Sequence, residues 1–158
     1  MWHNQIPDWV TRKGDGSLVS DNTLYRNIFD HISSVAGRYS GKIKGWDVVN
    51  EAILDDGSYR ENDFYKISAD EYIFKSFEIA HKIDPNAELY YNDFSMYKPE
   101  KCDAAIRIAN KILERGLRID GIGLQAHWGL DYPSIDEIET SILKIHEAGF
   151  RVHFTELD

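Results

Sequence analysis

Short apolar runs alternate along the chain with longer amphipathic stretches. The apolar runs predict strands at residues 43–49, 88–92, 121–125 and 152–156. Between them, apolar residues recur at three- and four-residue spacing, as in helices that bury one face. This regular alternation of strand and helix predicts an α/β fold with a parallel sheet and right-handed crossovers. The strand runs are apolar on both faces, which is typical of a sheet covered by helices.

Helix-end signals and helical spacing agree on four helices. The apolar residues at helical spacing are Leu24, Ile28, Ile32 and Val35 in residues 22–39, then Ile73, Phe77 and Ala80, then Ala105, Ile108 and Ile112, and finally Ile138, Ile142 and Ile145. The predicted start signals are Ser20 or Asp21 as caps and the capping boxes Ser68 with Glu71 and Ser134 with Glu137. The predicted stops are Pro85, Gly116 and Gly149.

Composition narrows the class of protein. The 158 residues are 42% hydrophobic and 28% charged, with no linker or repeat, which suits one globular domain. A net charge of −9 with scattered Lys and Arg argues against nucleic acid and anionic membranes as partners. No apolar run approaches the roughly 18 residues of a membrane span. Cys102 is the only cysteine, which excludes an internal disulfide and a zinc site built from cysteines.

Polar side chains follow each predicted strand. They are Asn50 and Glu51, Asn92 and Asp93, Gln125 and His127, and Glu156 and Asp158. Active sites of α/β barrels are built at the carboxyl ends of several strands, so we expect these side chains to lie together. Metal-ligand spacing and phosphate-binding glycine loops are not found, so we expect neither metal nor cofactor.

The two glutamates carry the chemical hypothesis. A single buried glutamate after a strand is often an ion-pair partner. The joint placement of Glu51 and Glu156 favours acid/base chemistry on a glycosidic bond, where one carboxyl donates a proton and the other attacks the anomeric carbon. His127 is either a core histidine or a residue that holds a carboxylate, and its place beside Gln125 favours the second. We expect His153 to face the helices.

The first residues are open to two interpretations. Trp2-His3-Asn4-Gln5 is either a polar N-terminal segment or the end of a strand that presents a ring and polar groups to sugar hydroxyls. Aromatic residues make up 13% of the chain, and sugar faces stack well on such rings.

These motifs together resemble the family 10 glycoside hydrolases, which are mostly endo-β-1,4-xylanases. The resemblance covers essentially the whole chain, in the family's order and spacing. The matching motifs are Trp2-His3-Asn4-Gln5 with Pro7-Asp8-Trp9, Trp46-Asp47-Val48-Val49-Asn50-Glu51-Ala52, Tyr91-Asn92-Asp93, Ile122-Gly123-Leu124-Gln125-Ala126-His127, and Thr155-Glu156-Leu157-Asp158.

The resemblance implies a role for the residues at each motif. Glu51 would be the general acid/base and Glu156 the nucleophile of a retaining, double-displacement hydrolysis of xylan. His127 would bond to Glu156, with Asp158 orienting the imidazole. The expected substrate-binding residues are Asn50 at the sugar 2-hydroxyl, Gln125 beside the nucleophile, Trp2, His3 and Gln5 on the glycone side, and Asn92.

The resemblance also implies a fold and a setting. Family members are (β/α)8 barrels, and this chain corresponds to a partial TIM barrel from the end of the third strand to the seventh. We therefore expect residues 1–158 to be an incomplete catalytic domain with open sheet edges, poorly stable and weakly active alone. The expected partner is xylan or a xylo-oligosaccharide, with no obligate protein partner. No signal peptide follows Met1, and the intact protein is expected to be secreted, periplasmic or at the cell surface.

Three alternatives remain open at this point. A retaining barrel glycosidase could act on another β-1,4-glucan such as cellulose, because xylose preference depends on walls that are partly absent. The chain could instead be a non-catalytic carbohydrate-binding fragment. The third is a flavodoxin-like open sheet with an unrelated function, which would need no carboxylate pair.

Overall fold

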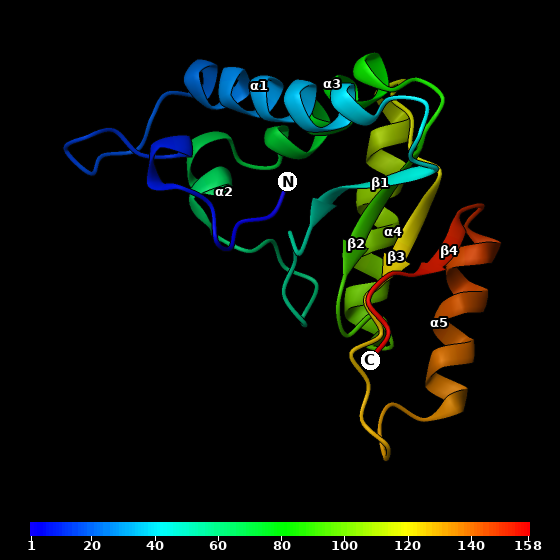
Figure 1. Cartoon of the computed structure of the whole chain (residues 1–158). Helices are drawn as coiled ribbons and strands as arrows, with labels where there is room; N and C mark the ends of the chain where they lie inside the picture. The colour runs from blue at the N-terminus through cyan, green and yellow to red at the C-terminus, as the bar shows by residue number, and fades with distance from the viewer.

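A four-stranded parallel sheet forms the centre of the protein, whose computed structural model covers residues 1–158 (Figure 1). Its strands lie side by side in chain order: β1 (Gly45–Asn50), β2 (Glu88–Asp93), β3 (Gly121–Leu124) and β4 (Arg151–Phe154). The predicted α/β fold with a parallel sheet is confirmed. Strand β4 ends at Phe154, so Glu156 lies in the segment after the strand and not within it.

The other regular elements are five α-helices and one short 3₁₀ helix, and the helices that contact the strands cover one face of the sheet (Figure 1). They are η1 (Asp8–Val10), α1 (Asp21–Tyr39), α2 (Asp63–Ser68), α3 (Glu71–Ile83), α4 (Pro99–Glu114) and α5 (Ile135–Glu147). The four predicted helices correspond to α1, α3, α4 and α5. The six-residue α2 was not predicted, because it is too short to show a helical repeat.

The predicted capping box at Ser68 is wrong. Ser68 is the last residue of α2, and its hydroxyl donates to the Phe64 carbonyl at 3.2 Å. Helix α3 begins after Asp70, which makes no side-chain cap. The spacing of a Ser and a Glu matched by chance, because Ala69, with φ 51°, turns the chain between two helices.

The other helix-end predictions are confirmed. Ser134 accepts from the Glu137 amide at 3.3 Å while its own amide donates to the Glu137 carboxylate at 2.8 Å, a reciprocal capping box. Ser20 caps α1 by accepting from the Thr23 amide. Gly116 and Gly149 follow α4 and α5 with φ of 72° and 92°, which glycine adopts without strain.

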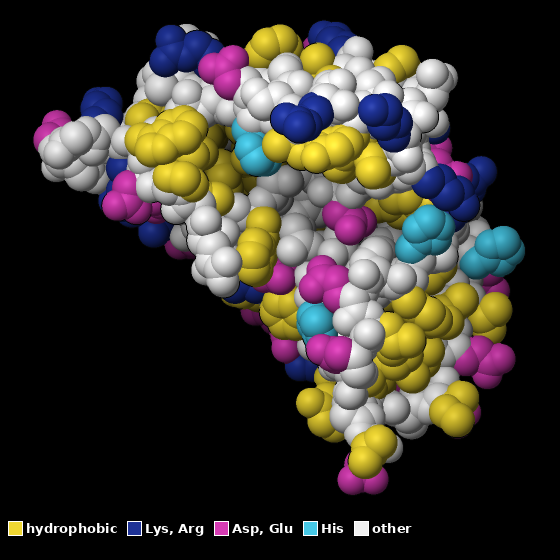
Figure 2. Space-filling view, in the orientation of Figure 1, with side chains coloured by type: hydrophobic (Ala, Val, Ile, Leu, Met, Phe, Trp, Pro, Cys, Tyr) yellow, Lys and Arg dark blue, Asp and Glu magenta, His cyan; other side chains and the backbone are white.

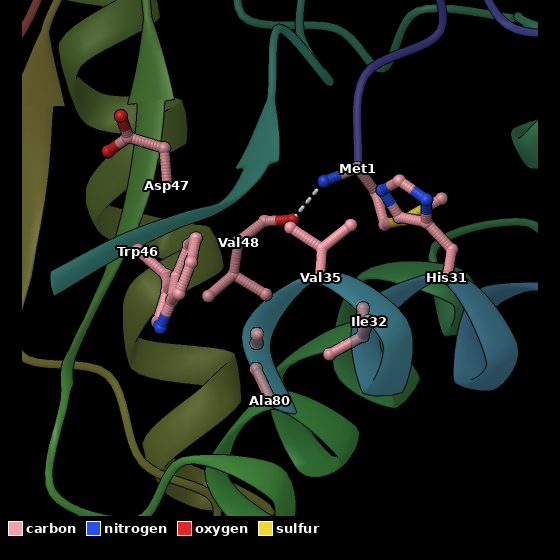
Figure 3. A pocket seen from close by; sticks show the side chains of 9 residues that line it. Met1, His31, Ile32, Val35, Trp46, Asp47, Val48 and Ala80 are labelled. Atoms are coloured by element: carbon pink, nitrogen blue, oxygen red, sulfur yellow. Dashed lines mark hydrogen bonds between the residues drawn. The ribbon is translucent and has the colours of Figure 1, made fainter. Parts of the chain in front are cut away.

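The core lies between the sheet and the helices. Alternate strand residues such as Leu89, Tyr91 and Ile122 are fully buried in one apolar cluster with the helices. Figure 3 shows its edge, where Ile32 of α1 faces Val48 of β1 around a cavity of about 80 Å³. Burial of this apolar surface is the main force that holds the helices on the sheet.

The first residues extend the sheet beside β1. The Asn50 amide donates to the Met1 carbonyl at 2.8 Å, and Trp2 forms a parallel bridge with Asn50. The Met1 amino group donates to the Val48 carbonyl (Figure 3). This parallel pairing agrees with the interpretation of Trp2 and its neighbours as the end of a strand.

The sheet face opposite the helices is polar. The Tyr90 hydroxyl donates to Glu88 at 2.6 Å, Arg151 pairs with Glu88, and the Tyr90 and His153 rings stack at 4.3 Å. His153 therefore faces this polar side, and the expectation that it faces the helices is wrong. Gly121 makes the stacking possible, because a Cβ there would lie 2.6 Å from the Tyr90 ring.

Apolar side chains are exposed beside β4 and α5 (Figure 2). Leu143, Phe154 and Leu157 have 49%, 48% and 65% of their surface exposed. This agrees with the expected open edge of the sheet. None of the helices has the length and apolar character needed to cross a membrane.

We predict that Ser134→Ala lowers the free energy of unfolding by about 1 kcal/mol, because it removes a working cap. The matched control is Ser68→Ala, which we expect to change it by less than about 0.5 kcal/mol, since that hydroxyl only bonds back within its own helix. Urea denaturation of both variants measures the difference. Equal effects would contradict the assignment of the two helix starts.

Candidate active site

Three amide side chains connect the two glutamates at the carboxyl ends of the strands. The Gln125 amide donates to Glu51 Oε1 at 3.1 Å and to Asn50 Oδ1 at 3.2 Å. The Asn92 amide donates to the same Asn50 oxygen at 2.8 Å and to Glu156 Oε1 at 2.9 Å. Residues that follow or end all four strands thus form one hydrogen-bonded chain with a carboxylate at each end.

The Glu51 backbone adopts an uncommon conformation directly after β1. Its φ is 58°, in the left-handed region that costs a non-glycine residue about 1–3 kcal/mol when it is strained. Its amide donates to the Asn92 carbonyl at 3.0 Å, and its carbonyl accepts from Arg60 Nε at 3.0 Å. These bonds turn the Glu51 side chain toward Gln125.

His127 joins Glu156 to Asp158. Its Nε2 lies 3.2 Å from Glu156 Oε2, and its Nδ1 lies 3.0 Å from Asp158 Oδ2. The hydrogen bond to Asp158, supported by Glu156, raises the pKa of His127 above its ordinary value of 6.5. Figure 2 shows acidic and histidine side chains gathered near the C-terminus on this open face. Glu156 therefore has a hydrogen-bond partner on each oxygen.

Asn92 is held by its neighbours so that its NH₂ group faces the site. It is 1% exposed, and its Oδ1 accepts from the Thr155 hydroxyl at 2.7 Å. Gly123 lies against it, and a Cβ there would come within 2.5 Å of Asn92 Oδ1. The oxygen side is fully occupied, so the Nδ2 hydrogens point to Asn50 and Glu156.

The N-terminal residues Trp2, His3 and Gln5 differ in how close they lie to the two glutamates and in how deeply they are buried. Trp2 pairs with Asn50, and both Trp2 Nε1 and His3 Nδ1 are buried without a hydrogen-bond partner. Burial, and then the Arg60 charge, lower the pKa of His3, while Glu51 acts in the opposite direction. Gln5 is exposed, its backbone N–H donates to Asn4 Oδ1, and it lines a cavity of about 480 Å³ beside Trp2. The structure does not bring Gln5 into hydrogen-bond contact with either glutamate.

Gln125 lies beside Glu156 only through its main chain. Its carbonyl accepts from the Glu156 amide at 3.1 Å, whereas its side chain binds Glu51 and Asn50. The Gln125 main chain therefore lies beside Glu156, whereas its side-chain amide points toward β1; the role expected of Gln125 beside a nucleophile stays a prediction.

Three contributors to the site were missed by sequence reasoning. Arg60 reaches Glu51 from a hairpin, Thr155 orients Asn92, and Asp47 on β1 has its pKa raised by burial and by the charge of Glu156. Asp47 and Thr155 lie within the family motifs quoted above, but neither was named as a site residue. Arg60 has no characteristic spacing, since the hairpin sets its contact.

A parallel α/β sheet that carries two amide-bridged carboxylates at the carboxyl ends of its strands is the arrangement of an α/β-barrel glycoside hydrolase. Comparison with known proteins agrees. The model of glycosyl hydrolase family 10 matches residues 1–158, and the chain belongs to that family. Its fold is a partial TIM barrel.

The similar proteins are xylanases. The chain is 46% identical over 158 residues to endo-1,4-beta-xylanase A of Xylanibacter ruminicola, covering all of this chain and 43% of the relative. It matches a solved family 10 endoxylanase from a sugarcane soil metagenome with TM-score 0.95 and 42% identity, over 100% of this chain and 47% of the other. It also matches an intracellular xylanase of Thermoanaerobacterium saccharolyticum, solved with xylotetraose, with TM-score 0.91 and 34% identity, over 98% and 50%. The chain spans about half the length of these relatives.

We predict that Gly123→Ala lowers the free energy of unfolding by about 1–3 kcal/mol, because the added methyl group overlaps Asn92 and Thr155. It should also displace the Asn92 amide from Glu156. Gly14→Ala is the matched control, since a Cβ there meets nothing within 4 Å. Thermal unfolding of both variants measures the difference, and equal stability would show that Asn92 is free to move.

We predict a raised titration midpoint for His127, measured by NMR of its imidazole. Asp158→Asn should bring the midpoint back toward 6.5, and Glu156→Gln should do so to a smaller extent, because Asp158 is the larger cause. The stabilisation from this raised pKa is present below the unfolded-state pKa and is lost as pH rises through the folded-state value. Asp136→Asn, in the first turn of α5, is the control. An unchanged midpoint in Asp158→Asn would contradict the assignment.

Proposed function

We propose that this chain is the part of a family 10 catalytic domain that carries both catalytic carboxylates of a retaining endo-β-1,4-xylanase. The observation that carries the proposal is the chain of amides between Glu51 and Glu156, which holds the two carboxylates in one hydrogen-bonded network. The xylanase relatives named above support the choice of substrate.

In the first step, Glu156 attacks the anomeric carbon and Glu51 donates its proton to the departing sugar oxygen. The glycosidic bond breaks and an ester forms between Glu156 and the sugar. Glu51 Oε1 already accepts from Gln125, so Oε2 is the oxygen that carries the proton.

In the second step, Glu51, now ionised, takes a proton from water. The water oxygen attacks the anomeric carbon, the ester bond breaks, and Glu156 leaves as a carboxylate. Asn92 and His127 donate to the two oxygens of Glu156 and so stabilise the charge that returns to it. Asp158 holds the His127 ring in the required orientation.

The substrate binds through amides and rings near the carboxylates. Asn50 Oδ1 is occupied by two donors, while its Nδ2 lies 3.5 Å from Glu51, so Nδ2 is free to donate to the sugar 2-hydroxyl. Trp2 and His3 are proposed to line the glycone side through other atoms of their rings, because Trp2 Nε1 and His3 Nδ1 are themselves buried. Xylo-oligosaccharides fit this proposal, as the xylotetraose complex of the T. saccharolyticum relative suggests.

For location we propose the cell exterior or envelope, because polymeric xylan does not cross a membrane. The intracellular T. saccharolyticum xylanase shows the other possibility for a relative. Fractionation of the source cells distinguishes the two.

We predict that reducing-sugar release from xylan falls by roughly 10⁴-fold or more in Glu156→Gln, because the amide cannot form the ester. Glu156→Gln keeps the size of the side chain and is compared with the parent protein on xylan and on cellulose. Equal release by parent and variant would contradict the assignment of Glu156. Release from cellulose in place of xylan would contradict the substrate, and xylan binding without any turnover in the parent would favour a carbohydrate-binding fragment.

A further inference from the structure

The main chain immediately after Glu51 is fixed by a buried tyrosine. The Ala52 amide donates to the Tyr91 hydroxyl at 3.0 Å, and Ala52 and Tyr91 are 1% and 0% exposed. Tyr91 lies on β2 and faces the helices, on the opposite side of the sheet from Asn92 and the two glutamates. Its hydroxyl therefore reaches the site only through the backbone of the residue that follows Glu51.

A buried ion pair holds this hydroxyl in turn. Tyr91 donates to Asp93 Oδ2 at 2.6 Å, and Asp93 Oδ1 lies 3.0 Å from Lys101 Nζ, with both charged side chains 0% exposed. Burial raises the pKa of Tyr91 well above its ordinary value, so the hydroxyl keeps its proton and donates it to Asp93. The lone pair of the hydroxyl is then directed at the Ala52 amide.

Lys101 of α4 is satisfied by further contacts that keep it in place. Its Nζ lies 3.2 Å from Asp55 Oδ1 and 3.5 Å from the centre of the Phe94 ring. A charge buried this completely is costly unless each of its donors has a partner. The network thus links α4 and β2 to the hairpin that follows Glu51.

Uncommon backbone geometry at Glu51 explains why such an anchor is needed. A non-glycine residue keeps a φ of 58° only where several surrounding contacts fix its backbone. Arg60 donates to the Glu51 carbonyl, and the Glu51 backbone N–H donates to the Asn92 carbonyl. The next backbone N–H, that of Ala52, donates to the Tyr91 hydroxyl. Loss of one of these hydrogen bonds lets the peptide between Glu51 and Ala52 rotate. The rotation moves the Glu51 carboxyl relative to the glycosidic oxygen.

We propose that Tyr91, anchored by the buried Asp93–Lys101 pair, is a positioning residue for the general acid/base Glu51. The inference rests on the proposed function, because it assigns a task to Tyr91 only if Glu51 donates the proton. It predicts a defect in proton donation and not a general loss of the fold.

The test compares two aryl β-xylobiosides in Tyr91→Phe. Departure of phenol requires a proton from Glu51, whereas 2,4-dinitrophenol departs without one. We expect kcat/KM for the phenyl substrate to fall by about 10- to 100-fold and for the dinitrophenyl substrate by less than about 3-fold, because misplacement of the acid affects only the first. Glu51→Ala serves as the reference and should show the same selectivity more strongly.

The matched control is Tyr72→Phe. Tyr72 of α3 is 2% exposed and also loses only a hydroxyl, but the Ala52 amide bonds to Tyr91 and not to Tyr72. It should leave the ratio of the two kcat/KM values unchanged. NMR hydrogen exchange provides a second measurement: the Ala52 amide should exchange faster in Tyr91→Phe and at the parent rate in Tyr72→Phe.

The outcomes separate the inference from the proposed function. Equal losses on both substrates in Tyr91→Phe, no loss on either, or unchanged Ala52 exchange would overturn the positioning role while the proposed function stands. Equal losses on the two substrates in Glu51→Ala would overturn the proposed function and the inference with it.

Discussion

Parallel pairing in register brings Asn50, Asn92 and Gly123 to the same level of the sheet, and the site is built on that level. Strands that all point the same way release their following residues at one edge, so residues far apart in the chain meet there. A slip of one residue in β2 would exchange Asn92 for a residue that faces the helices. The contacts between the two glutamates pass through Asn92, so they depend on this register before any feature of the loops.

One face of the sheet packs against the helices, and the other carries the hydrogen-bonded polar side chains. Leu89 and Tyr91 enter the apolar layer under the helices, whereas Tyr90 and Asn92, next to them in sequence, lie on the polar face. Gly121 and Gly123 leave room on that face for the side chains of neighbouring strands. Close packing of the apolar face against the helices fixes the position of each strand. Because both faces belong to the same backbone, this packing also fixes the positions of the hydrogen-bonding side chains on the polar face.

The strand and helix order and most helix ends were predictable because they are local properties of the chain. Hydrophobic period and capping residues act over a few positions, and they located β1–β4, α1, α3, α4 and α5. The error at Ser68 arose because a Ser and a Glu three residues apart form a capping box only when the backbone between them enters a helix, and here Ala69 turns it away. The direction of His153 was also wrong: it lies between the apolar residues Val152 and Phe154, and strand alternation places it on the other face, where its ring stacks on Tyr90.

By itself, the sequence determined the fold class and the set of polar residues at the strand ends. Both depend on local features, namely the spacing of apolar residues and the residues that directly follow each apolar run. Its motifs also carried the resemblance to family 10. Only the tertiary structure decided which atoms meet: that Gln125 binds Glu51 with its side chain and Glu156 with its backbone, that Arg60 closes on the Glu51 carbonyl, and that Tyr91 reaches Ala52. These contacts depend on strand register, hairpin path and one left-handed residue, and such long-range geometry has no signature in local spacing.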